Sequence, residues 1–217
     1  MVFQLDEGLW FPNPSCAEPN GLLAVGGDLR VERLLLAYSH GIFPWYENKE
    51  PILWWCPRER FVIDPDAIHV SRSMEKFMRR HEVKVAMNRD FADTIHRCRL
   101  KREDREGTWI TDEMEAAYLQ LHESGYAASV EAYVDGTLAG GLYGVQLCHC
   151  FFGESMFSDL PNGSKLALIA LARYLASCDY QMIDCQFHTP HLESMGGVYI
   201  SYDAFMERIE KGRVIGI

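Results

Sequence analysis

Residues 129–158 read SVEAYVDGTLAGGLYGVQLCHCFFGESMFS and decide the fold of this 217-residue chain. Asp135-Gly136 favours a tight hairpin turn, and the segments on either side of it are rich in β-branched, aromatic and other apolar residues. We therefore predict a hairpin of two strands, over 129–134 and 138–147, followed by a third strand over 148–158. The next segment, residues 164–177, has apolar residues at helical spacing and predicts a long amphipathic helix.

Regular elements are also predicted on both sides of this antiparallel meander. Before it we expect helices over 71–80 and 90–100, a strand over 82–87 and a third helix capped by Thr111. After it we expect a buried strand over 182–186 and a last helix over 202–211. This order indicates an α+β fold with a mixed, mainly antiparallel sheet, and it resembles the acetyltransferase (GNAT-type) fold.

The first sixty residues have a different texture, rich in aromatic residues, proline and glycine. Asp28 is expected to cap a short helix over 31–39, which Gly41 closes. We predict a small N-terminal domain over residues 1–62 and an acetyltransferase-like domain over residues 63–217.

The charge of the chain is negative overall but unevenly distributed. It has 21 Lys and Arg residues against 31 Asp and Glu residues, a net charge of −10. Between residues 69 and 105, eleven basic residues stand against six acidic ones, so this sector carries +5 and the remainder −15. Such a sector can bind a phosphate backbone that the rest of the protein repels. A solvated, charge-balanced helix face is the alternative.

The sequence favours a cytoplasmic location. It contains no apolar run of about 20 residues, the length that a membrane helix needs, and acids at positions 6 and 7 disfavour a signal peptide. The seven cysteines are scattered and odd in number, which indicates free thiols in a reducing compartment.

Two carboxylates lie within strongly apolar segments. Glu154 interrupts an aromatic strand, and Asp184 interrupts a second buried strand, where it shares a face with Gln186. A buried charge is costly, so each acid needs a partner or a function. The acids could form buried salt bridges with an Arg or cap a helix. We favour a pocket with an apolar body and a polar end.

Two further sites can be imagined from thiols and imidazoles. A zinc site would use Cys148, Cys150, Cys185, His188 and His191, but no strong ligand spacing supports it, and buried thiols are the better interpretation. Cys185 beside His188 could form a nucleophile and base, if the thiol pKa were depressed and the two side chains met. Gly140-Gly141 lies between strand segments and is interpreted as strand glycine rather than a dinucleotide loop.

Long motifs, together and in order, carry a resemblance that extends to about residue 205. They are Pro19-Asn-Gly-Leu-Leu-Ala-Val-Gly-Gly-Asp28, Gly41-Ile-Phe-Pro-Trp45, Trp54-Trp55, Glu106-Gly-Thr-Trp-Ile110, Gly153-Glu-Ser-Met-Phe-Ser158, Ser164-Lys165 and Asp184-Cys-Gln186. The chain resembles the leucyl/phenylalanyl-tRNA–protein transferase family. The resemblance implies transfer of Leu or Phe, and sometimes Met, from tRNA onto an N-terminal Arg or Lys of a protein, which creates a bacterial degradation signal. It also implies a cytoplasmic monomer that needs no metal or organic cofactor.

The resemblance assigns roles to residues of this chain by motif position. The reaction centre would be Asp184 and Gln186, with Glu154 facing positive charge. Trp45 and Trp109 would lie at the terminal adenosine of the tRNA, near Tyr118. The apolar pocket lining would be Leu142, Phe151, Met156, Leu168, Leu171 and Ile183, and the tRNA-binding helix would present Arg72, Lys76, Arg79 and Arg80.

The chain departs from related patterns at two places. The junction Asp159-Leu-Pro-Asn-Gly-Ser-Lys165 lacks the glycine-rich turn by which acetyl-CoA enzymes hold pyrophosphate, which favours a donor other than CoA. Ile200-Ser201-Tyr202 stands where the family usually has Ile-Pro-Arg. Two other classes stay open at this stage: a tRNA-binding module without catalysis, and a small-molecule or peptidoglycan acyltransferase.

Overall fold

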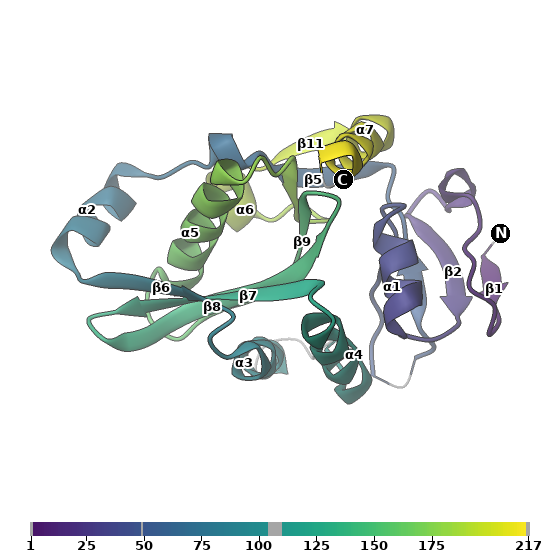
Figure 1. Ribbon diagram of the computed structural model, residues 1–217, viewed down its shortest axis with the longest axis horizontal. Coiled ribbons are helices and arrows are strands. Elements are labelled where there is room, and N and C mark those ends of the chain that lie inside the picture. Colours follow the sequence, from purple (N-terminus) through teal and green to yellow (C-terminus); the bar gives the residue numbers. More distant parts are fainter. Residues whose placement is uncertain (1, 49, 104–109, 216–217) are drawn as a thin grey trace.

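The computed structural model describes residues 2–48, 50–103 and 110–215, and contains two sheets of unequal size (Figure 1). The smaller sheet has the order β1-β2-β4-β3, where β1 and β2 are parallel and the other pairs antiparallel. Its strands are β1 (Phe3–Leu5), β2 (Leu22–Gly26), β3 (Phe43–Pro44) and β4 (Leu53–Trp55), and α1 (Val31–Tyr38) lies between β2 and β3 in the chain.

The larger sheet has the order β11-β5-β10-β9-β8-β7-β6. Only the β9–β10 pair is parallel, so the predicted mixed, mainly antiparallel sheet is confirmed. The predicted meander is β7, β8 and β9, to which β6 adds antiparallel. The strands are β5 (Glu59–Ile63), β6 (Val83–Met87), β7 (Ala127–Val134), β8 (Thr137–Leu147), β9 (Cys150–Ser158), β10 (Met182–Asp184) and β11 (Val198–Ser201).

Helices cover both faces of the larger sheet. On one face α5 (Gly163–Ser177) packs against β7, β8 and β9, and on the other face lie α3 (Phe91–Glu103) and α4 (Asp112–Glu123) (Figure 1). Alternation along β8 explains this, because Leu142 belongs to the core under α5 and Tyr143 to the core under α3 and α4. The remaining helices are α2 (Arg72–Arg80), α6 (Pro190–Ser194) and α7 (Tyr202–Ile215), with 3-10 turns at Pro14–Cys16 and Pro65–Ala67. None of the described helices is long and apolar enough to cross a membrane.

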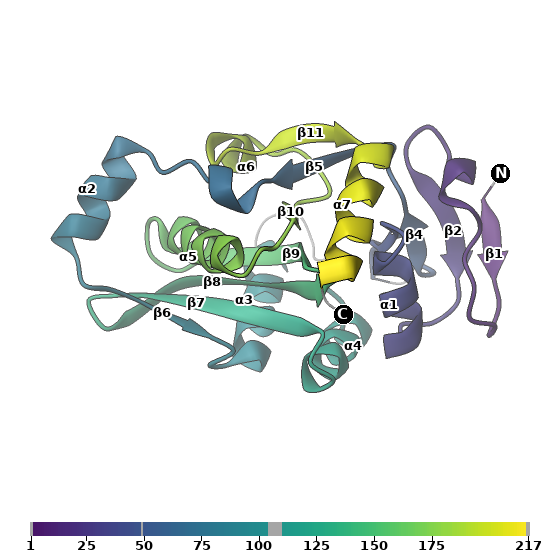
Figure 2. The ribbon, with the colours of Figure 1, turned by 45° about the horizontal axis from the view of Figure 1, so that its top comes forward.

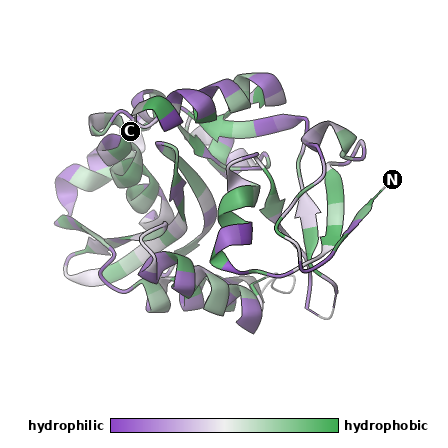
Figure 3. Cartoon of the chain, turned by 45° about the vertical axis from the view of Figure 1, so that its right-hand side comes forward, coloured by the Kyte–Doolittle hydropathy of each residue, from purple (hydrophilic) through white to green (hydrophobic). Residues whose placement is uncertain are grey.

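The two sheets share one hydrophobic core. Tyr38 of α1 packs against Phe152 of β9, with ring centroids 5.1 Å apart. Near the same place α7 lies beside α1 (Figure 2), and Arg213 of α7 donates to the carbonyl of Ser39 at 2.9 Å. Hydropathy colouring shows hydrophobic strands inside and hydrophilic helix turns outside (Figure 3). The predicted domain boundary after residue 62 stays a prediction; β5 pairs within the larger sheet from Glu59 onward.

Close packing of α5 on β8 depends on glycine. A Cβ atom on Gly163 would lie 1.9 Å from the carbonyl oxygen of Ala139, and one on Gly140 would lie 2.6 Å from the backbone of Gly163. The interpretation of Gly140-Gly141 as strand glycine that permits close approach of another backbone is therefore confirmed.

One of the two predicted side-chain caps is confirmed, because Thr111 accepts from the backbone N–H of Met114 at 3.2 Å. Ser71, which was not predicted as a cap, accepts in the same way from the backbone N–H of Met74 at 3.3 Å. The predicted Asp28 cap is wrong, because α1 begins after Arg30 with no side-chain cap.

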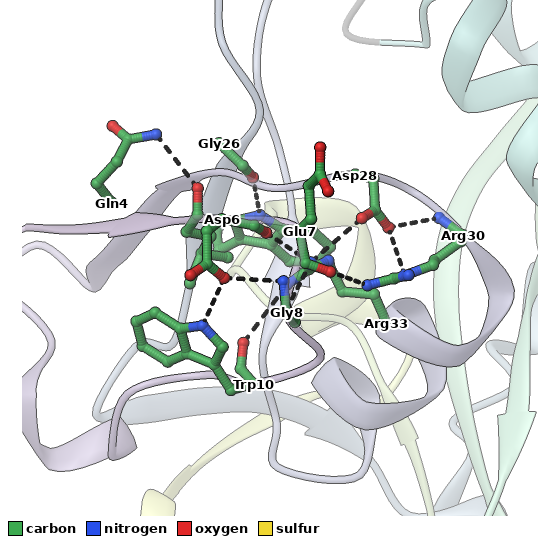
Figure 4. Close-up of polar contacts among 11 residues, drawn as sticks. Gln4, Asp6, Glu7, Gly8, Trp10, Gly26, Asp28, Arg30 and Arg33 are labelled. Carbon is green, nitrogen blue, oxygen red and sulfur yellow. Dashed lines mark hydrogen bonds and ion pairs between the residues drawn. The ribbon is translucent and has the colours of Figure 1, made fainter.

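Asp28 instead pairs with Arg33 at 3.2 Å, and it also accepts from the backbone N–H of Arg30 (Figure 4). Arg33 is fully buried and donates to the carbonyls of Asp6 and Gly8 as well. A buried guanidinium needs acceptors, so Asp28 serves the side chain of Arg33 rather than the helix end.

Two strand predictions extend too far. Cys148 and His149 form a turn with φ of 53° and 48°, so β9 begins at Cys150 rather than at Cys148. Likewise β10 ends at Asp184, and Gln186 has left the strand with φ of 56°. The predicted common strand face of Asp184 and Gln186 is therefore wrong.

Candidate active site

A cavity of about 330 Å³ lies between the larger sheet, α5 and the loop that follows β10. Strands β8, β9 and β10 form one wall and α5 another, while the end of β3 and residues 185–192 form the mouth. The residues that line it are Phe43, Pro44, Trp45, Leu142, Tyr143, Phe151, Gly153, Glu154, Ser155, Met156, Leu168, Leu171, Ile183, Cys185, Gln186, Phe187, Thr189, His191 and Leu192.

The apolar body of the cavity contains all six side chains that the sequence analysis assigned to a pocket. Four come from strands and two, Leu168 and Leu171, from one face of α5, where a spacing of three residues turns both toward the sheet. The four strand residues are Leu142, Phe151, Met156 and Ile183. Their role in binding a substrate stays a prediction.

The polar end of the cavity is Glu154. Its Oε1 accepts from the hydroxyl of Tyr38 at 2.7 Å, and its Oε2 accepts from the hydroxyl of Tyr118 at 3.0 Å. Burial raises the pKa of Glu154 to about 7, although the two hydroxyl donors oppose the rise. Both ionisation states of Glu154 are therefore populated at neutral pH.

Tyr118 lies behind Glu154 rather than at the cavity surface. Its side chain has no exposed area, it contributes nothing to the lining, and its hydroxyl also contacts that of Tyr38. Burial, reinforced by the charge of Glu154, raises the pKa of both tyrosines well above its usual value, so both stay protonated donors. In this structure Tyr118 supports Glu154 and is not open to an adenosine, contrary to the expectation.

The mouth of the cavity is aromatic. Trp45 is 42% exposed, and its ring lies 5.7 Å from that of Trp55 and 5.4 Å from that of Phe187. This is a surface on which a flat ring can stack. Trp109, the other tryptophan assigned by resemblance, lies outside the described residues.

Asp184 does not reach the cavity. It is fully buried, and its carboxylate forms an ion pair with Arg60 of β5, which is also fully buried. Of the interpretations considered for Asp184, the salt bridge to an Arg is the one that the structure bears out, and the pocket is wrong for this residue.

Gln186 does line the cavity. Its backbone N–H donates to Oδ1 of Asp184 at 2.9 Å, and its side-chain Nε2 is buried with no hydrogen-bond partner among the described residues. An unsatisfied buried amide donor is costly, which makes Nε2 available to a bound molecule.

The thiol alternatives lose support from the geometry. Burial raises the pKa of the Cys185 thiol, the opposite of what a nucleophile needs. Within the described residues His188 bonds to Glu193 at 3.0 Å, and the thiol of Cys185 bonds to the carbonyl of Ile183 rather than to His188. Within residues 2–48, 50–103 and 110–215 no three His, Cys, Asp or Glu side chains gather as metal ligands would. All seven cysteines are free thiols.

The basic sector separates into two parts with different surroundings. On α2, Arg72, Lys76, Arg79 and Arg80 are exposed, and within the described chain only Arg79 has an acidic neighbour within 4 Å, Glu75 at 3.8 Å. Three bases of α3 are paired with nearby acids: Arg97 with Asp93 and Asp159, Lys101 with Asp159, and Arg99 with Asp112 and Glu115. Of the described side chains of these two helices, those of α2 therefore carry the unpaired positive charge.

Sequence reasoning missed Tyr38, Arg60 and Phe187. Arg60 carried a usable signal, because it stands within the apolar strand Glu59–Ile63 and a buried cation needs a carboxylate. Tyr38 and Phe187 carried none, since an aromatic residue at a helix end or in a loop is ordinary core or surface material.

The topology and the cavity together define the fold class of the larger-sheet domain. A meander, a helix and then a strand parallel to the last meander strand form an acetyltransferase-like domain, and the cavity lies beside that parallel pair. Among solved structures, that described as L-PGS from Bacillus licheniformis aligns with a TM-score of 0.48 at 15% identity, over 90% of this chain and 73% of that one. The aminoglycoside N-acetyltransferase AAC(6')-Iy aligns with a TM-score of 0.36 at 16% identity, over 51% of this chain and 80% of that one.

Sequence comparison identifies the family. The family model described as "Leucyl/phenylalanyl-tRNA protein transferase" matches residues 62–210, and the model of its N-terminal domain matches residues 27–58. A leucyl/phenylalanyl-tRNA–protein transferase of Desulforapulum autotrophicum is 51% identical over 96% of this chain and 91% of its own length. Another, from Flavobacterium psychrophilum, is 49% identical over 95% of this chain and 99% of its own. The chain belongs to the leucyl/phenylalanyl-tRNA–protein transferase family and is an aminoacyltransferase.

Proposed function

We propose that this protein transfers Leu or Phe, and also Met, from aminoacyl-tRNA to the N-terminal Arg or Lys of acceptor proteins, creating a signal for their degradation. The cavity is the observation that supports this most directly. It has an apolar body, which includes the six assigned side chains, and one carboxylate, Glu154, at its polar end. An aminoacyl group with a large apolar side chain and an α-ammonium has the same two parts.

The reaction is a direct aminolysis. The aminoacyl ester is already activated, and an acceptor α-amine with a pKa of about 8 is partly neutral at pH 7. Its nitrogen attacks the ester carbonyl, the bond to the ribose oxygen breaks, and the amine proton passes to that oxygen. The enzyme has to align the amine, guide the proton and stabilise the oxyanion.

Gln186 has the position and the free donor for part of this work. Its side-chain oxygen can accept from the incoming amine, and its unpartnered Nε2 can donate to the developing oxyanion. Glu154 meets the α-ammonium of the donor. With a pKa of about 7, Glu154 becomes fully ionised when a cation binds beside it.

The rest of the donor is held outside the cavity. The exposed ring of Trp45 at the mouth suits the terminal adenosine, and the exposed bases of α2 suit the phosphates of the tRNA body. We expect a cytoplasmic monomer that needs no metal or organic cofactor.

One assay separates this proposal from its two rivals. Purified protein is mixed with radiolabelled Leu-tRNA or Phe-tRNA and a protein with N-terminal Arg, and the same protein with N-terminal Ser serves as control. Label in the Arg protein alone supports transfer. Binding of tRNA without transfer favours a tRNA-binding module, and acylation of a small amine from acetyl-CoA favours the other acyltransferase class.

A further inference from the structure

Arg60 is held at the centre of a small buried network beside the cavity. Its side chain has no exposed area, and its guanidinium lies 4.9 Å from the ring centroid of Phe43 and 4.4 Å from that of Phe205. One Nη atom donates to the carbonyl of Gly41. The two rings and the bond to Gly41 restrict the orientation of the guanidinium.

The remaining edge of the guanidinium binds Asp184. Nε of Arg60 donates to Oδ1 at 3.2 Å, and the second Nη atom donates to Oδ2. Oδ1 also accepts the backbone N–H of Gln186 at 2.9 Å. Both oxygens of Asp184 are therefore occupied, and neither is exposed to the cavity.

Gln186 needs this support because its backbone is unusual. A φ of 56° lies in the left-handed region, which is unfavourable for a residue with a side chain. Its carbonyl accepts from the N–H of Phe61 at 3.3 Å, so one end of the residue is held by the strand that contains Arg60 and the other by Asp184. This conformation places the amide of Gln186 in the cavity wall.

We propose that Arg60 is a positioning residue for the transfer reaction: through Asp184 it holds Gln186 in the conformation that presents its amide to the cavity. Asp184 is then a fixed link between Arg60 and Gln186, and it takes no proton during the reaction. The inference rests on the proposed role of Gln186 and deepens it.

The interpretation of Asp184 as a general base makes a different prediction. A base would be lost for good in Asp184→Asn, whatever stands at position 60. If Asp184 is instead a link between Arg60 and Gln186, Asp184→Asn leaves the charge of Arg60 unpaired. A second substitution that removes this charge then relieves the defect.

The test is a double-mutant cycle of Arg60→Gln and Asp184→Asn, with kcat and KM measured for transfer from Phe-tRNA to a peptide with N-terminal Arg. We expect each single variant to lose about 100-fold in kcat, with KM for Phe-tRNA unchanged, because the reacting groups are misplaced while the tRNA contacts remain. The double variant should recover about tenfold relative to Asp184→Asn. A double variant no better than Asp184→Asn would overturn the proposal.

Arg33→Gln is the matched control, because Arg33 is equally buried but belongs to α1, bonds to the carbonyls of Asp6 and Gly8 (Figure 4) and does not line the cavity. It should lower Tm as Arg60→Gln does, with kcat per folded molecule unchanged. If Arg60→Gln behaved in the same way, Arg60 would be merely structural. Arg60→Lys keeps the charge and loses the planar set of guanidinium donors, so the variant should fold and still lose about tenfold in kcat.

Hydrogen exchange supplies a readout that does not depend on transfer. The backbone N–H of Gln186, which donates to Asp184, should exchange about tenfold faster in Arg60→Lys than in wild type. Its exchange rate should remain unchanged in Arg33→Gln. Unchanged exchange in Arg60→Lys would overturn the proposal even if activity fell. Absence of transfer by the wild-type protein would defeat the proposed function instead, and the exchange measurement would still decide what Arg60 holds.

Discussion

Tyr118→Phe tests whether the reaction needs Glu154 in its ionised form. The substitution keeps the buried ring and removes the hydroxyl that donates to Oε2 of Glu154 at 3.0 Å, while the hydroxyl of Tyr38 still donates to Oε1. A donor to a carboxylate stabilises its charged form, so the loss of one donor raises the pKa of Glu154 further above its usual value. Less of the enzyme then carries the charge that an ammonium group needs.

The size of the effect follows from the present ionisation of Glu154. With a pKa of about 7, Glu154 is about half ionised at pH 7. A hydrogen bond to a charged group is worth about 1.5 kcal/mol or more, which corresponds to about a tenfold change in the ionisation equilibrium. The ionised fraction at pH 7 therefore falls to about one tenth or less. The transfer rate of the variant is therefore reduced at pH values below the raised pKa of Glu154 and normal above it.

The assay is transfer of Phe from a short aminoacyl-adenosine donor to a peptide with N-terminal Arg, from pH 6 to 9. The variant rate is divided by the wild-type rate, so ionisation of the acceptor amine cancels. We expect a ratio of about one fifth or less at pH 7 that approaches one near pH 9. Tyr202→Phe is the control, because it removes a hydroxyl that donates to His40 rather than to Glu154, and its ratio should not vary with pH. A ratio for Tyr118→Phe that is constant over this range would refute the reasoning.

Three other variants test the cavity, the basic helix and the packing of α5. Leu171→Trp should reduce transfer of Phe more than of Met, whose flexible side chain adapts to a reshaped cavity; equal losses in initial rate would remove Leu171 from the binding wall. Arg72→Ala combined with Lys76→Ala should weaken binding of Leu-tRNA and Phe-tRNA alike. The slope of log K against log salt should become less steep by about one unit or less for each lost phosphate contact, while transfer from aminoacyl-adenosine stays near wild type. Equal loss of tRNA binding and of transfer from aminoacyl-adenosine would mean that the helix is structural. Gly163→Ala should lower the free energy of unfolding by about 1–3 kcal/mol in urea titrations, because its Cβ atom would lie 1.9 Å from a carbonyl oxygen of β8. Gly153→Ala is the control and should cost less, because the nearest atom to its Cβ would be 3.5 Å away. Equal losses of unfolding free energy would contradict the close-packing argument.

The parts of the fold that the sequence predicts are those written in local patterns. The Asp135-Gly136 turn, the strands on each side of it and the apolar periodicity of α5 are all contained in about fifty consecutive residues. The predicted cap at Thr111 is equally local, since its side chain bonds a backbone N–H three residues ahead. The six apolar lining residues were assigned by resemblance to a family. Periodicity alone predicts that such residues are buried, but it does not predict which cavity they share.

The polar partners of the site could not be predicted because they are remote in the chain. The bond from Tyr38 to Glu154 joins residues 116 positions apart, and that from Arg60 to Asp184 joins residues 124 positions apart. Desolvation cost predicts that each buried acid has a partner, but it does not name the partner. The end of β10 was missed for the same reason. Gln186 leaves the strand where its N–H turns to Asp184, and strand alternation contains no information about that carboxylate.

The two buried acids differ because their partners differ, and this difference determines the electrostatics of the cavity. Asp184 faces a guanidinium, so the pair is neutral and adds no net charge beside the cavity. Glu154 faces two hydroxyls, which stabilise a negative charge without cancelling it. Of these two acids, only Glu154 lines the cavity, and its pKa of about 7 records the cost of leaving that charge uncompensated. A cationic group bound next to Glu154 would remove this cost, and an α-ammonium attached to an apolar side chain is a cation that also fills the space beside it.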